Sequence, residues 1–217
     1  MEYQQQDNIG VISFDDGKVN AVNPDFVNGF MGHLDTAEKD AQAIVITGRD
    51  GMFSAGYDLK IIEADPKAGR AMIQQGMELV YRLYSFPMPV IAACDGHAIG
   101  LGAFLLMSSD TRIGSEGDYK VQLPETAISM PFNTLLLELA QARLKRQEHV
   151  KRILQSVPCS PTEAVTAGFL DELVEKSALH MVALETAKAL AALPSKFYIK
   201  NKLDLRADSL KRMQQDL

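Results

Sequence analysis

Two segments of this chain share one pattern, in which an apolar run typical of a buried strand enters a glycine-bearing turn and then residues able to begin a helix. They are Thr47–Asp58 and Cys94–Phe104. Glycine lets the main chain approach a ligand closely, and a helix N-terminus presents unpaired N–H groups. Two such turns side by side could hold an oxyanion, although turns of this kind also occur wherever a chain must reverse.

The segments around these turns predict an α/β fold with a helical C-terminal part. Strands are expected at Ile9–Phe14, Ala43–Thr47, Val90–Cys94, Thr111–Gly114 and Tyr119–Val121. Helices are expected from Pro24 to about Lys39, from about Pro66 to Phe86, from about Ala103 to Ser109, and over most of the chain beyond Pro131. We expect a core over residues 1–158 and a helical, oligomer-forming region over residues 159–217.

Composition restricts the class of partner. The 217 residues carry a net charge of −6 with no separate basic cluster, which argues against nucleic-acid binding. No apolar run is long enough to predict a membrane span. The two cysteines, Cys94 and Cys159, are too few for a disulfide framework, and the N-terminus lacks a signal-peptide pattern, so we expect a cytoplasmic protein.

Familiar site motifs are missing from the glycine-bearing turns. Gly100-Leu101-Gly102 lacks the third glycine of a dinucleotide-binding turn, and neither a P-loop nor a GxSxG elbow occurs. The four histidines show no metal-binding spacing, so no metal site is expected. We therefore expect the two turns to bind an anion that is neither a nucleotide phosphate on a P-loop nor a metal-bound group.

A series of ordered motifs resembles the crotonase superfamily, the enoyl-CoA hydratase/isomerase fold. The resemblance is collinear over about residues 8 to 175 and is carried by Gly17–Asn23, Phe53–Leu59, Pro89–Ala93, Gly96–Gly102, Asp110–Arg112, Leu123–Glu125, Pro161–Ala164 and Gly168–Asp171.

This resemblance implies a spiral of ββα units, C-terminal helices that mediate assembly into a trimer or a dimer of trimers, and an acyl-CoA substrate. No separate cofactor is implied, because coenzyme A is part of the substrate. The oxyanion hole would consist of the backbone N–H groups of Tyr57 and Leu101, which would stabilise the enolate formed next to a thioester. The residues implied to contact the coenzyme A or acyl parts are Lys18, Val19, Ala21, Ser54, Ala55, Gly56, Asp58, Leu59, Lys60, Gly100, Phe104, Pro124 and Phe132.

One carboxylate distinguishes the reactions within this superfamily. Hydratases carry two glutamates, and the resemblance places Phe104 at the first position and Glu125 at the second. A single base suits the transfer of a proton from C2 to C4, the pattern of the Δ3,Δ2-enoyl-CoA isomerases. Glu125 after a proline is also ordinary chemistry for the first turn of a helix.

Several alternatives stay open on the sequence alone. Lys18 and Lys60 would approach the coenzyme A phosphates or ribose, or they are ordinary surface lysines. Lys200 and Lys202 lie where relatives reach the coenzyme A of a neighbouring subunit. Besides the isomerase, the chain could be another acyl-CoA enzyme of this fold, such as a hydratase, decarboxylase or thioesterase, or a non-catalytic acyl-CoA-binding protein.

Overall fold

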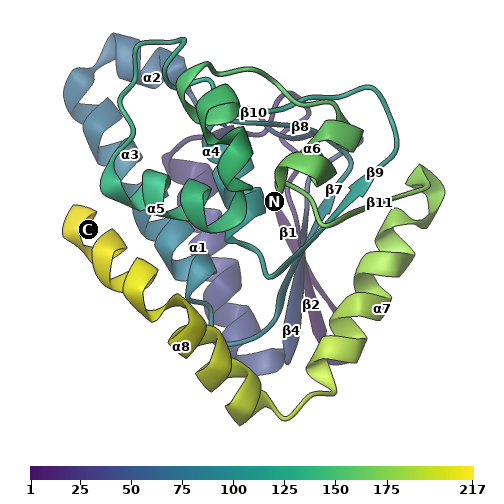
Figure 1. Cartoon of the computed structure of the whole chain (residues 1–217). Coiled ribbons are helices and arrows are strands. Elements are labelled where there is room, and N and C mark those ends of the chain that lie inside the picture. Colours follow the sequence, from purple (N-terminus) through teal and green to yellow (C-terminus); the bar gives the residue numbers. More distant parts are fainter.

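A six-stranded sheet runs through the centre of the molecule (Figure 1). The computed structural model describes residues 1–217. In sheet order the strands are β1 (Glu2–Gln6), β2 (Ile9–Ser13), β4 (Ala43–Thr47), β7 (Val90–Cys94), β9 (Thr111–Ser115) and β11 (Glu172–Val174). Strand β1 is antiparallel to β2, and every other neighbouring pair in this sheet is parallel.

The chain repeats one ββα pattern along the central sheet. After each of β2, β4, β7 and β9, it forms short strands outside the central sheet and then one or more helices. The short strands are β3 (Ala21–Val22), β5 (Gly51–Ser54), β6 (Gly56–Tyr57), β8 (Gly96–Ile99) and β10 (Val121–Gln122), and they form the sheets β10-β8-β5 and β3-β6. The helices are α1 (Pro24–Asp40), α2 (Leu59–Ala64), α3 (Pro66–Tyr84), α4 (Leu101–Ser108) and α5 (Thr134–Arg143).

Residue alternation along the central strands gives the sheet two buried faces. Val11, Val45 and Ile91 face a smaller cluster that includes Leu179 and Ala183. Their neighbours along the strands, such as Ile12, Ile44 and Ala92, belong to the main core beneath α1, α3 and α4. Figure 1 shows the single helix α7 (Leu179–Ala191) on one side of the sheet and the other long helices on the opposite side.

Local signals fix the starts of the two long N-terminal helices. Asn23 caps α1 by accepting a hydrogen bond from the N–H of Phe26, and Pro24 is the first helical residue. Asp65 does the same for α3 by accepting from Lys67 and Ala68, and Pro66 follows it. Proline is favoured there because its missing N–H would have no acceptor in the helix.

The C-terminal region is helical, as expected, and it shares the core of the preceding residues. It contains α6 (Pro161–Ala167), α7 (Leu179–Ala191) and α8 (Ser195–Met213). Phe169, Leu210 and Met213 belong to the main hydrophobic cluster, and β11 pairs with β9 in the central sheet. A boundary at 158/159 therefore does not separate two cores.

One strand was missed, and two local expectations differ from the structure. Strand β1 was not predicted because its polar sequence EYQQQ lacks apolar alternation, and it lies at the sheet edge. Strand β11 has only three residues and was expected to be part of a helical region. Helix α4 begins at Leu101 rather than near Ala103.

None of the helices combines the length and apolar composition that crossing a membrane would require.

Candidate active site

The fold brings the two glycine-bearing turns into contact. Strand β5 of the first turn pairs with β8 of the second, with Gly51 opposite Gly96. Gly56 has a φ of +82°, and a Cβ on it would lie 2.7 Å from the Ile99 carbonyl oxygen and 3.1 Å from the Leu101 nitrogen. Only glycine fits this approach without strain, so the sequence pattern reflects a real close contact.

The two N–H groups expected to form an oxyanion hole lie on these adjoining turns. Leu101 is the first residue of α4, where a backbone N–H has no acceptor within the helix. Gly100 precedes it with a φ of +52°. Tyr57 directly follows Gly56 in β6. The arrangement places the start of a helix beside a tight strand turn, as an anion-binding site requires.

A cavity of about 450 Å³ opens beside these turns and has a largely apolar wall. The residues that line it include Ala55, Gly56, Tyr57, Leu59, Gly100, Leu101, Pro124 and Glu125, all of which the sequence had singled out. The other lining residues are Ile73, Met77, Ile99, Ile128, Met130, Pro131, Asn133 and Leu136.

Glu125 is the only carboxyl group that lines the cavity. Its side chain is buried, and Oε2 has no hydrogen-bond partner in the protein. A Cβ on Gly100 would lie 3.5 Å from Oε1, so the carboxyl group lies close to the second turn. Burial disfavours the charged form and raises the pKa of Glu125 to about 7. A carboxyl group with this pKa can accept and return a proton near neutral pH.

Glu125 lies in an irregular turn rather than at the start of a helix. The five residues 125–129 form turns, and Met130 N–H donates to the Glu125 carbonyl oxygen at 2.8 Å. The hydroxyl of Thr126 donates to the Ile153 carbonyl, and the N–H of Ala127 donates to the Ser156 hydroxyl. The helix-capping interpretation of Glu125 is therefore wrong, because no helix begins there and the loop is fixed from outside.

Ser54 and Asn20 support the first turn from behind. The hydroxyl of Ser54 donates to the Asn20 carbonyl at 2.7 Å and accepts from the Gly56 N–H at 3.2 Å. The buried amide of Asn20 donates to the carbonyls of Phe14 and Phe53. Ser54, which was expected to contact the substrate, and Asn20, for which no role was predicted, both hold the turn in place.

The Tyr57 side chain is fixed separately from its N–H. Its hydroxyl donates to the Ile73 carbonyl in α3 at 2.9 Å. Burial and the nearby Glu125 charge raise the pKa of Tyr57 above its usual range. The phenol is therefore a neutral part of the cavity wall that ties β6 to α3.

Five of the residues expected to contact the substrate lie beside the cavity and not in its wall: Lys18, Val19, Ala21, Asp58 and Lys60. The carbonyl of Val19 accepts from the Ala55 N–H at 3.0 Å, and Ala21 pairs with Gly56. Lys18 and Lys60 are exposed, and Asp58 caps α2 by accepting from the Lys60 N–H. The fold thus brings residues 18–21 and 54–60 together around the first turn.

Phe104 is withdrawn from the cavity. It is completely buried in α4, is absent from the cavity wall, and packs against Phe132 with ring centroids 6.3 Å apart. Phe132 is likewise absent from the wall, although its neighbours Met130 and Pro131 belong to it. In this structure the two rings pack against each other behind the lining residues.

Of the two α8 lysines considered for coenzyme A contact, one is buried and one is exposed. Lys202 is buried, and its Nζ lies 2.8 Å from Asp110 Oδ2, so it is not free to reach coenzyme A. Lys200 is exposed and pairs with Asp204.

Burial raises the pKa of both cysteines to about 12, so neither is an activated nucleophile.

Sequence analysis missed the far wall of the cavity. Ile73 and Met77 come from α3, and Asn133 and Leu136 come from the start of α5. Their positions look like ordinary helix positions in the sequence, and no local signal marks them. Asn133, which also lines the cavity, is the N-cap of α5, and its side chain accepts from the Leu136 N–H.

Comparison with known proteins identifies relatives of the whole chain. The family model described as enoyl-CoA hydratase/isomerase matches residues 4–217. A probable enoyl-CoA hydratase of Bacillus subtilis is 30% identical over 188 residues, covering 85% of this chain and 71% of the relative.

Solved structures agree over the full fold. The structure of an enoyl-CoA isomerase of Mycobacterium tuberculosis superposes with a TM-score of 0.94 at 38% identity, covering 99% of this chain and 94% of the other. An enoyl-CoA hydratase of Mycobacterium ulcerans gives a TM-score of 0.95 at 36% identity and covers 99% and 95% of the two chains. The ββα spiral predicted from the motifs is confirmed, and this chain belongs to the enoyl-CoA hydratase/isomerase family, the crotonase superfamily.

Proposed function

We propose that this enzyme moves the double bond of a 3-enoyl-CoA to the 2-position, as a Δ3,Δ2-enoyl-CoA isomerase. The observation that carries the proposal is the presence of one carboxyl group, Glu125, in an otherwise apolar cavity beside two helix- and strand-derived N–H groups. One base is enough for a proton that leaves and returns on the same face of the substrate.

In the proposed reaction, the Glu125 carboxylate removes a proton from C2 of the bound thioester. The charge that develops on the thioester oxygen is stabilised by the N–H groups of Tyr57 and Leu101, each worth on the order of 3 kcal/mol. The protonated Glu125 then returns the proton at C4. Burial supports both halves of this cycle, because a pKa of about 7 leaves neither form strongly disfavoured.

A hydratase is the second candidate, because several structural relatives are named as hydratases, including that of Mycobacterium ulcerans. Hydration requires one group to activate water and another to protonate carbon. The position that carries the first hydratase glutamate holds Phe104, which is buried away from the cavity. This arrangement supports the isomerase over the hydratase.

One pair of substrates distinguishes the candidates. Purified protein is incubated separately with 3-hexenoyl-CoA and 2-hexenoyl-CoA while the absorbance of the conjugated thioester is followed. The isomerase produces this absorbance from the first substrate and leaves that of the second nearly unchanged. Rapid loss of the 2-enoyl signal with formation of 3-hydroxyacyl-CoA would instead establish the hydratase, and no change with either substrate would leave a binding protein.

The remaining expectations belong to the same proposal. The enzyme would act in the cytoplasm on acyl-CoA without a separate cofactor or metal. It would assemble through its C-terminal helices as a trimer or a dimer of trimers. Light scattering on the purified protein measures the assembly directly.

A further inference from the structure

Helix α3 contains a buried glycine, Gly76, well inside its span. Glycine in a helix interior is unfavourable relative to alanine, because it loses more backbone freedom on folding. Gly76 does not have a positive φ, so its backbone conformation does not require glycine. The absence of a side chain at this position therefore serves the packing around it.

The residues packed against Gly76 are the two whose N–H groups would form the oxyanion hole. A Cβ at this position would lie 2.7 Å from Cε1 of the Tyr57 ring and 2.8 Å from Cδ2 of Leu101, and it would overlap the Tyr57 hydroxyl oxygen. That hydroxyl donates to the carbonyl of Ile73, which lies three residues earlier in the same helix. The phenol thus reaches the helix backbone through the space that a side chain at residue 76 would fill.

Both neighbours are fixed in place by other contacts. Leu101 is 2% exposed and belongs to α4, in which every residue is buried. The ring of Tyr57 borders the cavity on one side and is tied to α3 through its hydroxyl. A methyl group on residue 76 would either push β6 and the start of α4 away from α3 or break the hydrogen bond to Ile73. The first change displaces both N–H groups, and the second removes the contact that holds β6 against α3.

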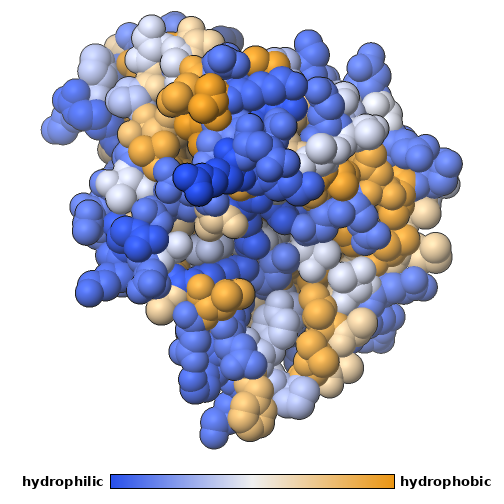
Figure 2. Space-filling view, viewed as in Figure 1, coloured by the Kyte–Doolittle hydropathy of each residue, from blue (hydrophilic) through white to orange (hydrophobic).

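A second glycine of α3, Gly69, provides a comparison. It lies seven residues before Gly76, close to two helical turns, so the two glycines share one side of the helix. This side faces the protein, whereas the outer surface at the upper left edge of Figure 2, near α2 and the start of α3, is mostly hydrophilic. A Cβ on Gly69 would lie 2.9 Å from Cα of Ile62 in α2. Gly69 therefore accommodates α2, and Gly76 accommodates the oxyanion turns.

We propose that Gly76 is a positioning residue for the oxyanion hole. Because it lacks a side chain, α3 can hold Tyr57 and Leu101 together and so fix the placement of their two N–H groups. This inference rests on the proposed function, in which those groups bind the thioester oxygen. Donors of this kind act through their placement, so a small displacement weakens the stabilisation of the developing charge. Gly76 itself is absent from the cavity wall and touches no substrate.

The variant Gly76→Ala tests this role in steady-state kinetics. We expect kcat with 3-hexenoyl-CoA to fall at least about tenfold while KM changes by less than about threefold, because the donors matter most where charge develops in the transition state. A purely destabilising substitution would lower the amount of folded protein and leave the kcat of the folded fraction unchanged.

A second measurement requires no turnover. Hexanoyl-CoA that carries carbon-13 at the thioester carbonyl is a saturated ligand, and hydrogen bonds to its carbonyl oxygen move the carbon signal downfield in the NMR spectrum. Binding to the wild-type protein should produce this shift. Binding to Gly76→Ala should produce at most about half of it, because the two donors no longer face the oxygen together.

Two alanine variants are matched controls. Gly69→Ala adds the same methyl group to the same side of α3, against α2, and should keep the carbonyl shift of wild type. Gly32→Ala adds a methyl group at an exposed position of α1, where a Cβ meets nothing within 4 Å. It should keep both the carbonyl shift and kcat.

A folded Gly76→Ala protein with the kcat and the carbonyl shift of wild type would overturn the proposal. An equal loss of the shift in Gly69→Ala would also overturn it, because any added volume in α3 would then have the same effect. If circular dichroism shows that Gly76→Ala does not fold, the comparison is made in a Leu101→Ala background, where the new methyl group still meets Tyr57. Adding Gly76→Ala there should reduce the carbonyl shift further, and an unchanged shift would overturn the proposal.

The carbonyl shift also separates this proposal from the proposed reaction. A wild-type protein that shifts the signal without isomerising 3-hexenoyl-CoA would contradict the isomerase alone, since loss of the shift in Gly76→Ala would still establish the positioning role. No shift in the wild-type protein would overturn the oxyanion hole and the role of Gly76 together.

Discussion

At the scale of single residues, Glu125 is set apart by what it lacks. The nearly buried carboxylate of Asp110 pairs with Lys202 and Arg206, whereas Glu125 Oε2 has no partner. A buried polar atom without a partner costs stability, so its retention at a cavity wall is typical of a functional group. Two predictions follow from this environment.

Replacement of Glu125 by Gln should lower the isomerase rate by at least about 10²-fold, the usual scale for loss of a general base. The amide has nearly the same shape, so binding of coenzyme A thioesters and the fold should persist. Steady-state kinetics with 3-hexenoyl-CoA measure the rate, and circular dichroism checks the fold. Retention of activity within a few-fold would exclude Glu125 as the base.

The pH profile should report the same carboxyl group. Because the pKa of Glu125 is raised to about 7, the base form predominates only above that value, and kcat/KM should rise with pH to a plateau above about 7. The free energy of unfolding should change with pH in the opposite direction. A carboxyl pKa that folding raises favours the folded state at low pH, and this contribution is lost as pH rises from the ordinary value toward 7. Glu125→Gln should abolish this part of the pH dependence of unfolding, and an unchanged profile would assign the titration elsewhere.

At the scale of elements, the site depends on β6 and α4 meeting at a distance that allows no side chain between them. Gly56 lies against Ile99 and Leu101, and every residue of α4 is buried. The elements are therefore held by packing on all sides, and small additions of volume should have large effects.

Gly56→Ala should reduce kcat by about 10² or more, because the new methyl group would push the Leu101 N–H out of position. Gly51→Ala is the matched control. Gly51 also has a positive φ, of +73°, but a Cβ there meets nothing within 4 Å. Both variants carry backbone strain, so a comparable kinetic loss in the two would show that strain alone, and not the oxyanion turn, limits the rate.

Phe104→Glu tests what α4 contributes to reaction choice. The resemblance places Phe104 where hydratases carry a glutamate, but the ring is completely buried behind the cavity wall. A carboxyl group there lacks solvation, so we expect a loss of several kcal/mol in unfolding free energy and little hydration of 2-enoyl-CoA. Phe104→Leu should lose less unfolding free energy than Phe104→Glu, as measured by denaturant melts. Efficient hydration by a stably folded Phe104→Glu protein would show that the side chain reaches the cavity after all.

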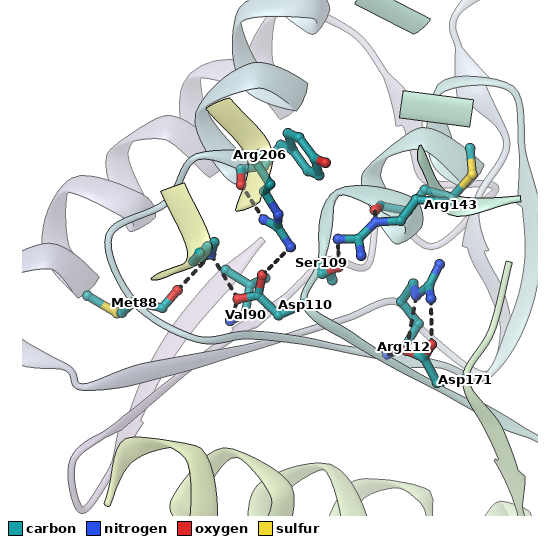
Figure 3. A network of polar contacts seen from close by, with 11 residues as sticks. Met88, Val90, Ser109, Asp110, Arg112, Arg143, Asp171 and Arg206 are labelled. Atoms are coloured by element: carbon teal, nitrogen blue, oxygen red, sulfur yellow. Dashed lines mark hydrogen bonds and ion pairs between the residues drawn. The ribbon is translucent and has the colours of Figure 1, made fainter. Parts of the chain in front are cut away.

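At the scale of the whole molecule, α8 is fastened to the body by one buried charge cluster. Asp110, between α4 and β9, accepts from the Val90 N–H and pairs with Lys202 and Arg206 of α8. Arg206 also lies over the Tyr84 ring, 4.2 Å from its centroid. The cluster thereby joins the central sheet, α3 and the C-terminal helix (Figure 3).

Asp110→Asn should destabilise the protein by about 3–5 kcal/mol, because it leaves two nearly buried cations without their counter-charge. The midpoint temperature of thermal unfolding should fall by on the order of 10 °C. Lys200→Gln, which removes an exposed pair on the same helix, should change the unfolding free energy by less than about 1 kcal/mol. Equal effects in the two variants would mean that the buried cluster does not fasten α8.

Much of the fold could be predicted because its signals are local in the sequence. Short continuous apolar runs predicted β2, β4 and β7, and Asn23-Pro24 and Asp65-Pro66 mark the starts of α1 and α3. The polar strand β1 and the three-residue β11 escaped because their pairing comes from neighbours distant in the chain. Local periodicity carries no information about such partners.

For the site, the sequence by itself determined the family, through ordered motifs, and with it the importance of Gly56, Gly100 and Glu125. Only the tertiary structure decided that the two turns touch, that Glu125 is buried without a partner, that Phe104 lies behind the wall, and that Lys202 serves Asp110. The reason is physical: a residue type and its spacing fix what a segment can form, whereas burial and charge partners depend on surfaces that meet only when parallel strands far apart in the chain are aligned.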